Sequence, residues 1–311
     1  MRNSVLYLLM SVAFAGIVSC STNSGKTAEN WKWYRGNTHT HATFSDENDT
    51  NDVPEIASWY EDEGYNFLVL SEHNDHLKEK KIFSHDELSH PPSFLMISGL
   101  ELSNSRHHLA FGINYYIGDE TSLQDGVEKT LAAGGIPILN HPQSPVEKTA
   151  DILAVKGLKH MEIANGGRPQ HIAASEVLWD SLLSDPNGRL IYAVGADDNH
   201  YSRKNVGRAW IMVKAPELTK EAIMDNFSKG NYYVSNGVLL NDYQADNKSI
   251  TVSSMNGDTI RFIGKYGAVL KTVAGKDGKY SISGDELYVR AKITGAGKAA
   301  WTQPVFISSG K

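Results

Sequence analysis

The chain has 311 residues, of which 41% are hydrophobic and 21% charged, and its formal net charge is −6. This length allows one large domain and a small one, each with a packed core. The acidic balance and the lack of a basic stretch exclude general nucleic-acid binding, because no run of cations could follow a phosphate backbone.

The first 20 residues have the pattern of an export signal. Arg2 supplies a positive end, and the apolar run Val5 to Val18 is too short to span a bilayer comfortably. The run ends in Ile17-Val18-Ser19-Cys20, which resembles a bacterial lipobox, and Cys20 is the only cysteine. We therefore expect a lipoprotein signal in residues 1–20 with lipidation of Cys20, and a plain cleaved signal peptide is the alternative.

Residues 21–30 are polar and small, as expected of a tether. The protein should therefore lie in the bacterial cell envelope, with the lipid on Cys20 as its membrane contact. Ser21 follows the cysteine and no acidic run comes after it, which favours the periplasmic side of the outer membrane.

Helix and strand patterns alternate from residue 52 to residue 237. Asp52 can cap a first helix, Pro54 suits its first turn, and Gly64 ends it. Further helices are expected at 127–133, 152–155, 172–183 and 220–227, and strands at 67–70, 136–139, 161–164, 190–194 and 209–213. Such alternation predicts an α/β fold with a mostly parallel sheet, either a closed or distorted barrel or an open doubly wound sheet.

The pattern changes after about residue 238. Short alternating runs are separated by turn signals such as Asn256-Gly257 and Asp277-Gly278. We predict a barrel domain over residues 31–237 and a small all-β, sandwich-like domain over residues 238–311.

Islands of metal-binding residue types follow the strand-like runs of the first domain. All 12 histidines lie between positions 39 and 200, so the last 111 residues contain none. In a barrel the carboxyl ends of the strands meet at one face, so these islands should converge. They read His39-Thr40-His41, Glu72-His73, Glu101, His107-His108, His141-Pro142 and Asp197-Asp198-Asn199-His200.

The ligand types narrow the metal. Imidazole and carboxylate without thiolate suit zinc, manganese or iron bound for hydrolysis. The candidate ligands outnumber the about four to six that one ion needs, which indicates two or three divalent ions. Such a cluster would lower the pKa of a bridging water to near neutrality.

These islands carry a family resemblance. The chain resembles the PHP (polymerase and histidinol phosphatase) superfamily over about residues 34–237, and the C-terminal part resembles secreted PHP lipoproteins that have a small β domain. The second motif of the family usually has Asp where this chain has Glu72. The matching segments are Gly36-Asn-Thr-His39-Thr-His41-Ala-Thr-Phe-Ser45-Asp46, Leu68-Val-Leu-Ser-Glu72-His73-Asn74, Gly99-Leu-Glu101, His107-His-Leu-Ala-Phe-Gly112, Asn140-His141-Pro142 and Gly195-Ala-Asp-Asp198-Asn-His200.

The resemblance implies a distorted (β/α)7 barrel with a trinuclear metal site. Glu72 and Asp198 would support the metal-bound hydroxide. One ion would be held by His39, His41, Glu101 and Asp198, a second by Glu101, His107 and His141, and a third by Asp46, His73 and His200.

Several choices stay open at this level. Strand alternation turns only one of His107 and His108 inward, and the spacing to Gly112 favours His107. Asp198 is favoured over Asp197 because Asp-x-His matches the family pattern. Arg168 and Arg203 are candidate substrate contacts, and Glu162 either orients a ligand, contacts substrate or pairs with a neighbouring helix.

The resulting functional hypothesis is a metal-dependent hydrolase that cleaves small phosphate esters. An amidohydrolase or esterase that cleaves a carbamate, amide or carboxylic ester is the alternative, because an activated hydroxide attacks carbon as well as phosphorus. A non-catalytic metal- or ligand-binding lipoprotein is a lesser alternative.

Overall fold

The computed structural model describes residues 31–42, 53–77, 81–84, 88, 93–143, 146–200 and 202–307. The expected signal and tether, residues 1–30 with Cys20, lie outside this described part, and so does Asp46. None of the helices in the described part has the length and apolar character needed to cross a membrane.

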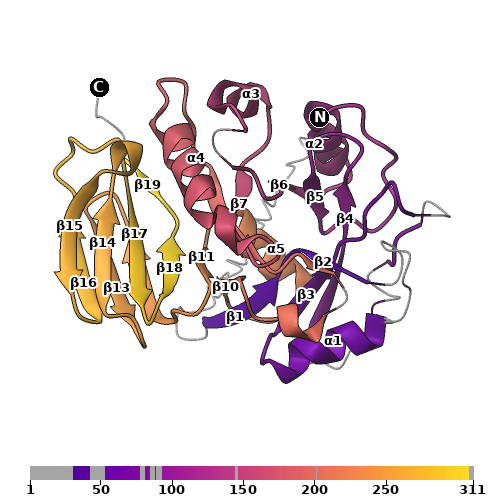
Figure 1. Cartoon of the computed structure of the whole chain (residues 1–311), viewed down its shortest axis with the longest axis horizontal. Helices are drawn as coiled ribbons and strands as arrows, with labels where there is room; N and C mark the ends of the chain where they lie inside the picture. Colours follow the sequence, from indigo (N-terminus) through magenta and orange to yellow (C-terminus); the bar gives the residue numbers. More distant parts are fainter. Residues whose placement is uncertain are drawn as a thin grey trace, which may run out of the picture.

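A 14-stranded mixed sheet runs through most of the molecule (Figure 1). A 3-stranded sheet of β12 (Leu240–Ala245), β13 (Ser249–Ser254) and β16 (Asp277–Ser281) lies beside it. In spatial order the large sheet contains β15 (Val269–Ala274), β14 (Thr259–Ile263), β17 (Tyr288–Gly295), β18 (Lys298–Thr302), β11 (Tyr232–Ser235), β10 (Trp210–Ala215), β1 (Lys32–Asn37), β3 (Phe67–Leu70), β4 (Leu95–Leu102), β5 (His108–Phe111), β6 (Ile136–Leu139), β7 (His160–Asn165) and β8 (Tyr192–Ala196), with β19 (Val305–Phe306) paired to β17.

Side-chain caps mark the starts of two helices, and a glycine follows the end of a third. Ser122 caps α2 by accepting the N–H of Asp125, and Thr219 caps α5 by accepting that of Ala222. Gly64 follows α1 with φ 75°, a conformation that glycine adopts without strain. The helices are α1 (Val53–Asp62), α2 (Leu123–Ala132), α3 (Thr149–Ala154), α4 (Ile172–Ser184) and α5 (Lys220–Ser228), with 3-10 turns η2 (Pro169–His171), η3 (Arg203–Asn205) and η4 (Lys265–Gly267).

The hydrogen-bonded sheet is not closed, which differs from the predicted distorted (β/α)7 barrel. Its strands from β1 to β8 follow chain order, as in a barrel, without the reversal of a doubly wound sheet. However, β5 is antiparallel to both β4 and β6. Only residues 103–107 separate β4 from β5, too few for the crossover that a parallel pair requires.

A separate short ladder joins the two ends of this strand series. β2 (Thr40–His41), which follows β1, pairs in parallel with β9 (Asn199–His200), which follows β8. The N–H of Asp198 also donates to the carbonyl of His39 at 3.1 Å. The sheet therefore curls until the carboxyl ends of β1 and β8 meet, although β8 has no ladder to β10 or β11.

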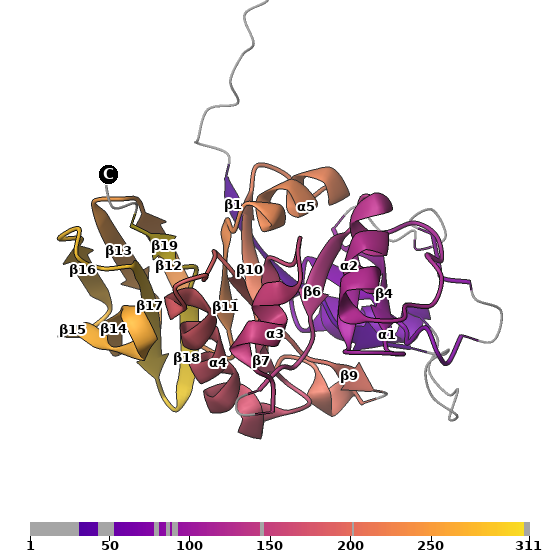
Figure 2. The same cartoon turned by 90° about the horizontal axis from the view of Figure 1, so that it is seen from above.

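In the C-terminal part, the 3-stranded sheet packs against the C-terminal strands of the large sheet in a sandwich-like arrangement. Apolar side chains of β13, β14 and β17 pack into one cluster that includes Val252, Phe262 and Ile293. β18 pairs with β11 in an antiparallel ladder, so the large sheet continues from the first part of the chain into the last. Figures 1 and 2 show α4 between these two parts, and the buried Arg290 of β17 pairs there with Glu176 and Asp180 of α4.

Candidate metal centre

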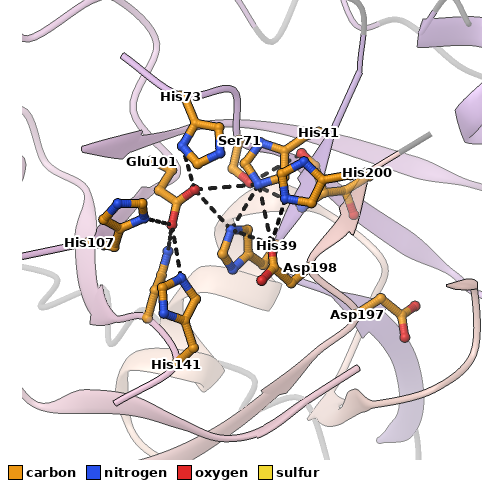
Figure 3. A network of polar contacts seen from close by, with 12 residues as sticks. His39, His41, Ser71, His73, Glu101, His107, His141, Asp197, Asp198 and His200 are labelled. Carbon is orange, nitrogen blue, oxygen red and sulfur yellow. Dashed lines mark hydrogen bonds and ion pairs between the residues drawn. The ribbon is translucent and has the colours of Figure 1, made fainter. Parts of the chain in front are cut away.

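Imidazole and carboxylate groups from separate strand ends converge on one point (Figure 3). The apolar strands β3, β4 and β8 are almost entirely buried, and they end at the same edge of the sheet, where polar side chains replace apolar ones. The residues brought together are His39 and His41 after β1, His73 after β3, Glu101 on β4, His107 before β5, His141 after β6, and Asp198 and His200 after β8.

Glu101 lies at the centre of this cluster and is fully buried. One carboxylate oxygen, Oε2, is surrounded by His39 Nε2 at 3.2 Å, His41 Nε2 at 3.4 Å and His73 Nδ1 at 2.9 Å. The other oxygen, Oε1, faces two further imidazoles, His107 Nδ1 at 3.1 Å and His141 Nε2 at 3.5 Å. One carboxylate therefore bridges two groups of imidazoles.

Asp198 provides the second central carboxylate. Its Oδ1 lies 3.3 Å from His39 Nε2, 3.4 Å from His41 Nε2 and 3.2 Å from His200 Nε2. The rings of His41 and His200 are stacked at a centroid distance of 4.2 Å. Asp198 and Glu101 thus approach the same two imidazoles from different sides.

Two of these residues have strained backbones. His141 has φ 34° and Asp198 has φ 50°, and they are two of the four non-glycine residues with positive φ in the described ranges. A left-handed conformation in such a residue costs about 1–3 kcal/mol, and such outliers cluster at functional sites. The strained backbone at these two residues directs the His141 ring and the Asp198 carboxylate towards the centre of the cluster.

The electrostatics of the cluster keep His41 neutral and both carboxylates charged, whereas His39 holds a proton. Burial lowers the pKa of His41 to about 3, so its ring is neutral near pH 7. Burial would raise the pKa of Glu101 and of Asp198, but the nearby imidazoles, His39 first, hold both well below the usual range. Burial likewise opposes charge on His39, yet Asp198, Glu101 and Glu162 raise its pKa well above the usual value. A cation bound there would replace that proton.

The donor set fits divalent cations. Glu101 Oε2 is buried and accepts no well-aligned hydrogen bond from the residues that the structure describes. Two imidazole nitrogens, His39 Nε2 and His41 Nε2, face each other at 3.0 Å. Three overlapping sets could hold an ion: His39, His41 and Glu101; His73, Glu101 and His107; and His41, His73 and His200. Nitrogen and oxygen atoms that converge in this way are stabilised as ligands when a cation lies between them.

The structure separates the two ambiguous pairs. His107 faces Glu101, whereas Nδ1 of the buried His108 bonds the carbonyl of Arg106 and its ring packs beneath Gly126 of α2. Asp198 lies in the cluster, whereas Asp197 is directed away from it (Figure 3). Asp197 accepts hydrogen bonds from the N–H groups of Gly207, Arg208 and Ala209 and from the hydroxyl of Tyr65.

Three further residues were predicted at the site, Glu72, Arg168 and Arg203, and only the first two lie beside the cluster. Glu72 is buried, and its Oε1 accepts the N–H of Ala42 at 2.7 Å, directly after His41. Arg168 is 47% exposed, with its Nε 4.0 Å from Asp198 Oδ2. Arg203 instead pairs with Asp62 of α1 at 2.8 Å.

Three neutral residues that orient the cluster were missed from the sequence. Asn140 donates to Glu101 Oε1 at 2.8 Å, Ser103 Oγ lies 2.7 Å from His73 Nδ1, and Asn165 donates to Asp198 Oδ2 at 3.1 Å. The positions of two of these residues gave a partial indication of their role, because Asn140 precedes His141 and Asn165 ends β7. Short amide and hydroxyl side chains are otherwise common in loops.

Comparison with known proteins gave matches among solved structures alone. No family model and no curated protein matches the chain. It is similar to a two-domain protein from Bacteroides vulgatus described as containing a predicted PHP-like metal-dependent phosphoesterase, with 14% identity, a TM-score of 0.48, and coverage of 89% of this chain and 96% of that one. It is also similar to PsfC from Pseudomonas syringae, with 11% identity, a TM-score of 0.48, and coverage of 63% and 88%. At these scores, the interpretation of the site rests on its own geometry.

Proposed function

We propose that this protein is a metal-dependent hydrolase whose reaction takes place at the Glu101 cluster. The observation that carries the proposal is the bridging position of Glu101, whose two oxygens face separate groups of imidazoles within 3.5 Å. Two or three divalent ions, zinc, manganese or iron, would supply an activated water and neutralise charge on the substrate oxygen.

The residues of the cluster would have different roles. One ion would be held by His39, His41, Glu101 and Asp198. A second would be held by Glu101 together with His107 and His141. His73 and His200 would contribute to a third. Glu72 would support the reactive centre indirectly, because it fixes the backbone next to His41.

The open side of the cluster supports an anionic substrate. His200 is 40% exposed and His107 is 33% exposed, so the substrate can approach there. Arg168 is 47% exposed and lies beside the cluster, with its Nε 4.0 Å from Asp198 Oδ2. A guanidinium group suits phosphate oxygens, so we propose a small phosphate ester as the substrate.

We also propose that the protein is a lipoprotein of the bacterial cell envelope, anchored through Cys20 on the periplasmic side of the outer membrane. The pattern of residues 1–30 supports this localisation. In this proposal, residues 31–237 form the hydrolase domain and residues 238–311 a β domain that braces it.

A substrate panel tests the reaction. Protein lacking residues 1–20 is assayed with manganese or zinc on phosphate monoesters, phosphate diesters and aryl carboxylic esters, beside His39→Ala. We expect release of phosphate by the wild type and loss of both activity and bound metal in the variant. Turnover of carboxylic esters alone would favour the amidohydrolase or esterase alternative. If His39→Ala retained all its metal and no substrate were cleaved, the proposal would be wrong.

A further inference from the structure

Glu162 lies behind the metal cluster and contacts two of its candidate ligands. It is on β7, between the neighbouring strands β6 and β8, and only 1% of it is exposed. Its Oε1 lies 2.8 Å from His39 Nδ1, and its Oε2 accepts the backbone N–H of His141 at 2.8 Å. The two oxygens of this buried carboxylate are therefore shared between ligands from different strand ends.

The contact with His39 sets the tautomer of that ring. A carboxylate only accepts hydrogen bonds, so His39 Nδ1 keeps its proton, and Nε2 is the nitrogen whose lone pair becomes available when a cation replaces the proton there. That Nε2 points to Glu101 Oε2 at 3.2 Å and to Asp198 Oδ1 at 3.3 Å. This is the arrangement in which a second carboxylate orients a metal-binding imidazole.

The contact with His141 acts through the backbone. The φ of His141 is 34°, a conformation that persists only when its surroundings hold it. Glu162 Oε2 accepts the N–H of this same strained residue, and the His141 ring then places Nε2 3.5 Å from Glu101 Oε1. If Glu162 moved away from His39, its hydrogen bond to the His141 N–H would therefore also be lost, and the backbone of His141 would no longer be held.

Asn165 extends the link to Asp198. Its Nδ2 donates to Glu162 Oε2 at 2.9 Å and to Asp198 Oδ2 at 3.1 Å, and its Oδ1 accepts the N–H of Arg168 at 3.0 Å. Glu162 and Asn165 both belong to β7. One rigid, buried strand thus sets the positions of candidate ligands that follow β1, β6 and β8.

We propose that Glu162 is a positioning residue that couples two metal subsites, the one containing His39 and the one containing His141. This inference rests on the proposed metal-dependent function. Filling one subsite fixes Glu162 in the position that the other subsite needs, so the two ions bind with positive cooperativity. Glu162 itself is not a ligand, because both of its oxygens already accept hydrogen bonds.

The decisive variant is Glu162→Gln, which preserves shape and volume. The glutamine amide has one acceptor oxygen and one donor nitrogen, whereas His39 Nδ1–H and the His141 N–H both require acceptors. One of the two contacts must be lost, and the coupling with it. Glu162→Asp retains the charge but is one methylene shorter, so it cannot reach both groups.

Metal binding to protein lacking residues 1–20 is measured by manganese titration, in which the bound ions are counted, and by the absorption spectrum of the cobalt-loaded protein. We expect cooperative binding by the wild type. In both Glu162 variants we expect about 10–100-fold weaker binding at both subsites, loss of cooperativity and an altered cobalt spectrum. Glu176→Gln is the matched control, because Glu176 is also buried and uses both oxygens, with Arg290 and Lys292. It should lower thermal stability and leave metal affinity unchanged.

Two results would overturn the coupling. One is a Glu162→Gln protein that binds metal with wild-type affinity and cooperativity, and the other is weakening at one subsite alone. Wild-type affinity in Glu162→Asp would likewise show that charge, without the span between the two ligands, is sufficient. Failure of the proposed function is a separate outcome, in which the wild type binds its ions cooperatively and cleaves no member of the substrate panel.

Discussion

Asp198 donates its backbone N–H to the carbonyl of His39 at 3.1 Å, while its Oδ1 lies 3.3 Å from His39 Nε2. Two residues 159 positions apart in the chain are thus joined by both backbone and side chain. The contact connects the ends of β1 and β8, and it places an imidazole and a carboxylate on the same point without a closed barrel.

Replacing Glu101 should abolish metal binding at both subsites. In Glu101→Gln the two oxygens that face five imidazoles are replaced by one oxygen and one amide nitrogen, and the negative charge is lost. We expect metal affinity to fall by more than the about 10–100-fold that loss of an outer-shell partner causes, and hydrolysis to fall with it. Elemental analysis of the dialysed protein checks the first result, and retention of two or more ions per chain would contradict it.

The neighbouring carboxylates Asp197 and Asp198 should give different phenotypes. Asp198→Asn should lose metal and activity while the fold remains. Asp197→Asn should keep its metal, because Asp197 is directed away from the cluster. However, the new amide N–H group would face the backbone N–H groups of Gly207, Arg208 and Ala209, so that donors would oppose donors.

We expect Asp197→Asn to lower the free energy of unfolding by about 1–3 kcal/mol. Urea unfolding and metal analysis of both variants test the pair. Equal metal loss in the two proteins would show that the structural distinction between them is wrong.

The ion pairs of Arg290 should make stability depend on pH. Burial would raise the pKa of Glu176, but Arg290 and Lys292 lower it below its ordinary value of 4.5. A carboxylate with a lowered folded-state pKa stabilises the protein fully above its unfolded-state pKa and loses that contribution as pH falls through the folded-state value. We therefore expect the contribution of Glu176 to be complete near pH 7 and to decline below about pH 4.5.

Arg290→Met should lower the free energy of unfolding by about 3–5 kcal/mol near pH 7, because it leaves Glu176 and Asp180 buried without this partner. The difference between variant and wild type should shrink as pH falls below 4.5. Denaturant unfolding at pH 7 and at pH 4 measures both quantities. A difference that is equal at the two pH values would contradict the role of these ion pairs.

Removing metal should lower stability and leave the secondary structure in place. The buried strands β3, β4 and β8 pack without the ions, but the cluster then holds Glu101 and Asp198 near imidazoles with no cation between them. Ions at 100 times their dissociation constant stabilise a folded protein by about 2.7 kcal/mol per site. We expect a chelator to lower Tm reversibly, with recovery on adding manganese, as followed by calorimetry. An unchanged Tm would show that the folded chain does not bind the ions.

Local chemistry made several features predictable. The capping pattern and Gly64 placed a helix where α1 is found, and continuous apolar runs placed strands at β3, β6 and β8. His39, His73, Glu101 and Asp198 were all recognisable because polar, metal-binding residue types follow runs that strands bury. Strand alternation turned only one of His107 and His108 inward, and the spacing to Gly112 favoured His107.

Tertiary structure alone decided which side chains converge and how they are oriented. The sheet stays open because β10 occupies the edge of β1 on which β8 would pair to close a ring. Periodicity along one segment does not report which strands will be its neighbours. The roles of Glu162, Asn140, Asn165 and Ser103 depend on hydrogen bonds between strands that are distant in sequence. The sequence determined which residues could bind a metal and where strands would present them. The fold decided which of them share a point in space, because that depends on the register and curvature of strands whose contacts are long-range.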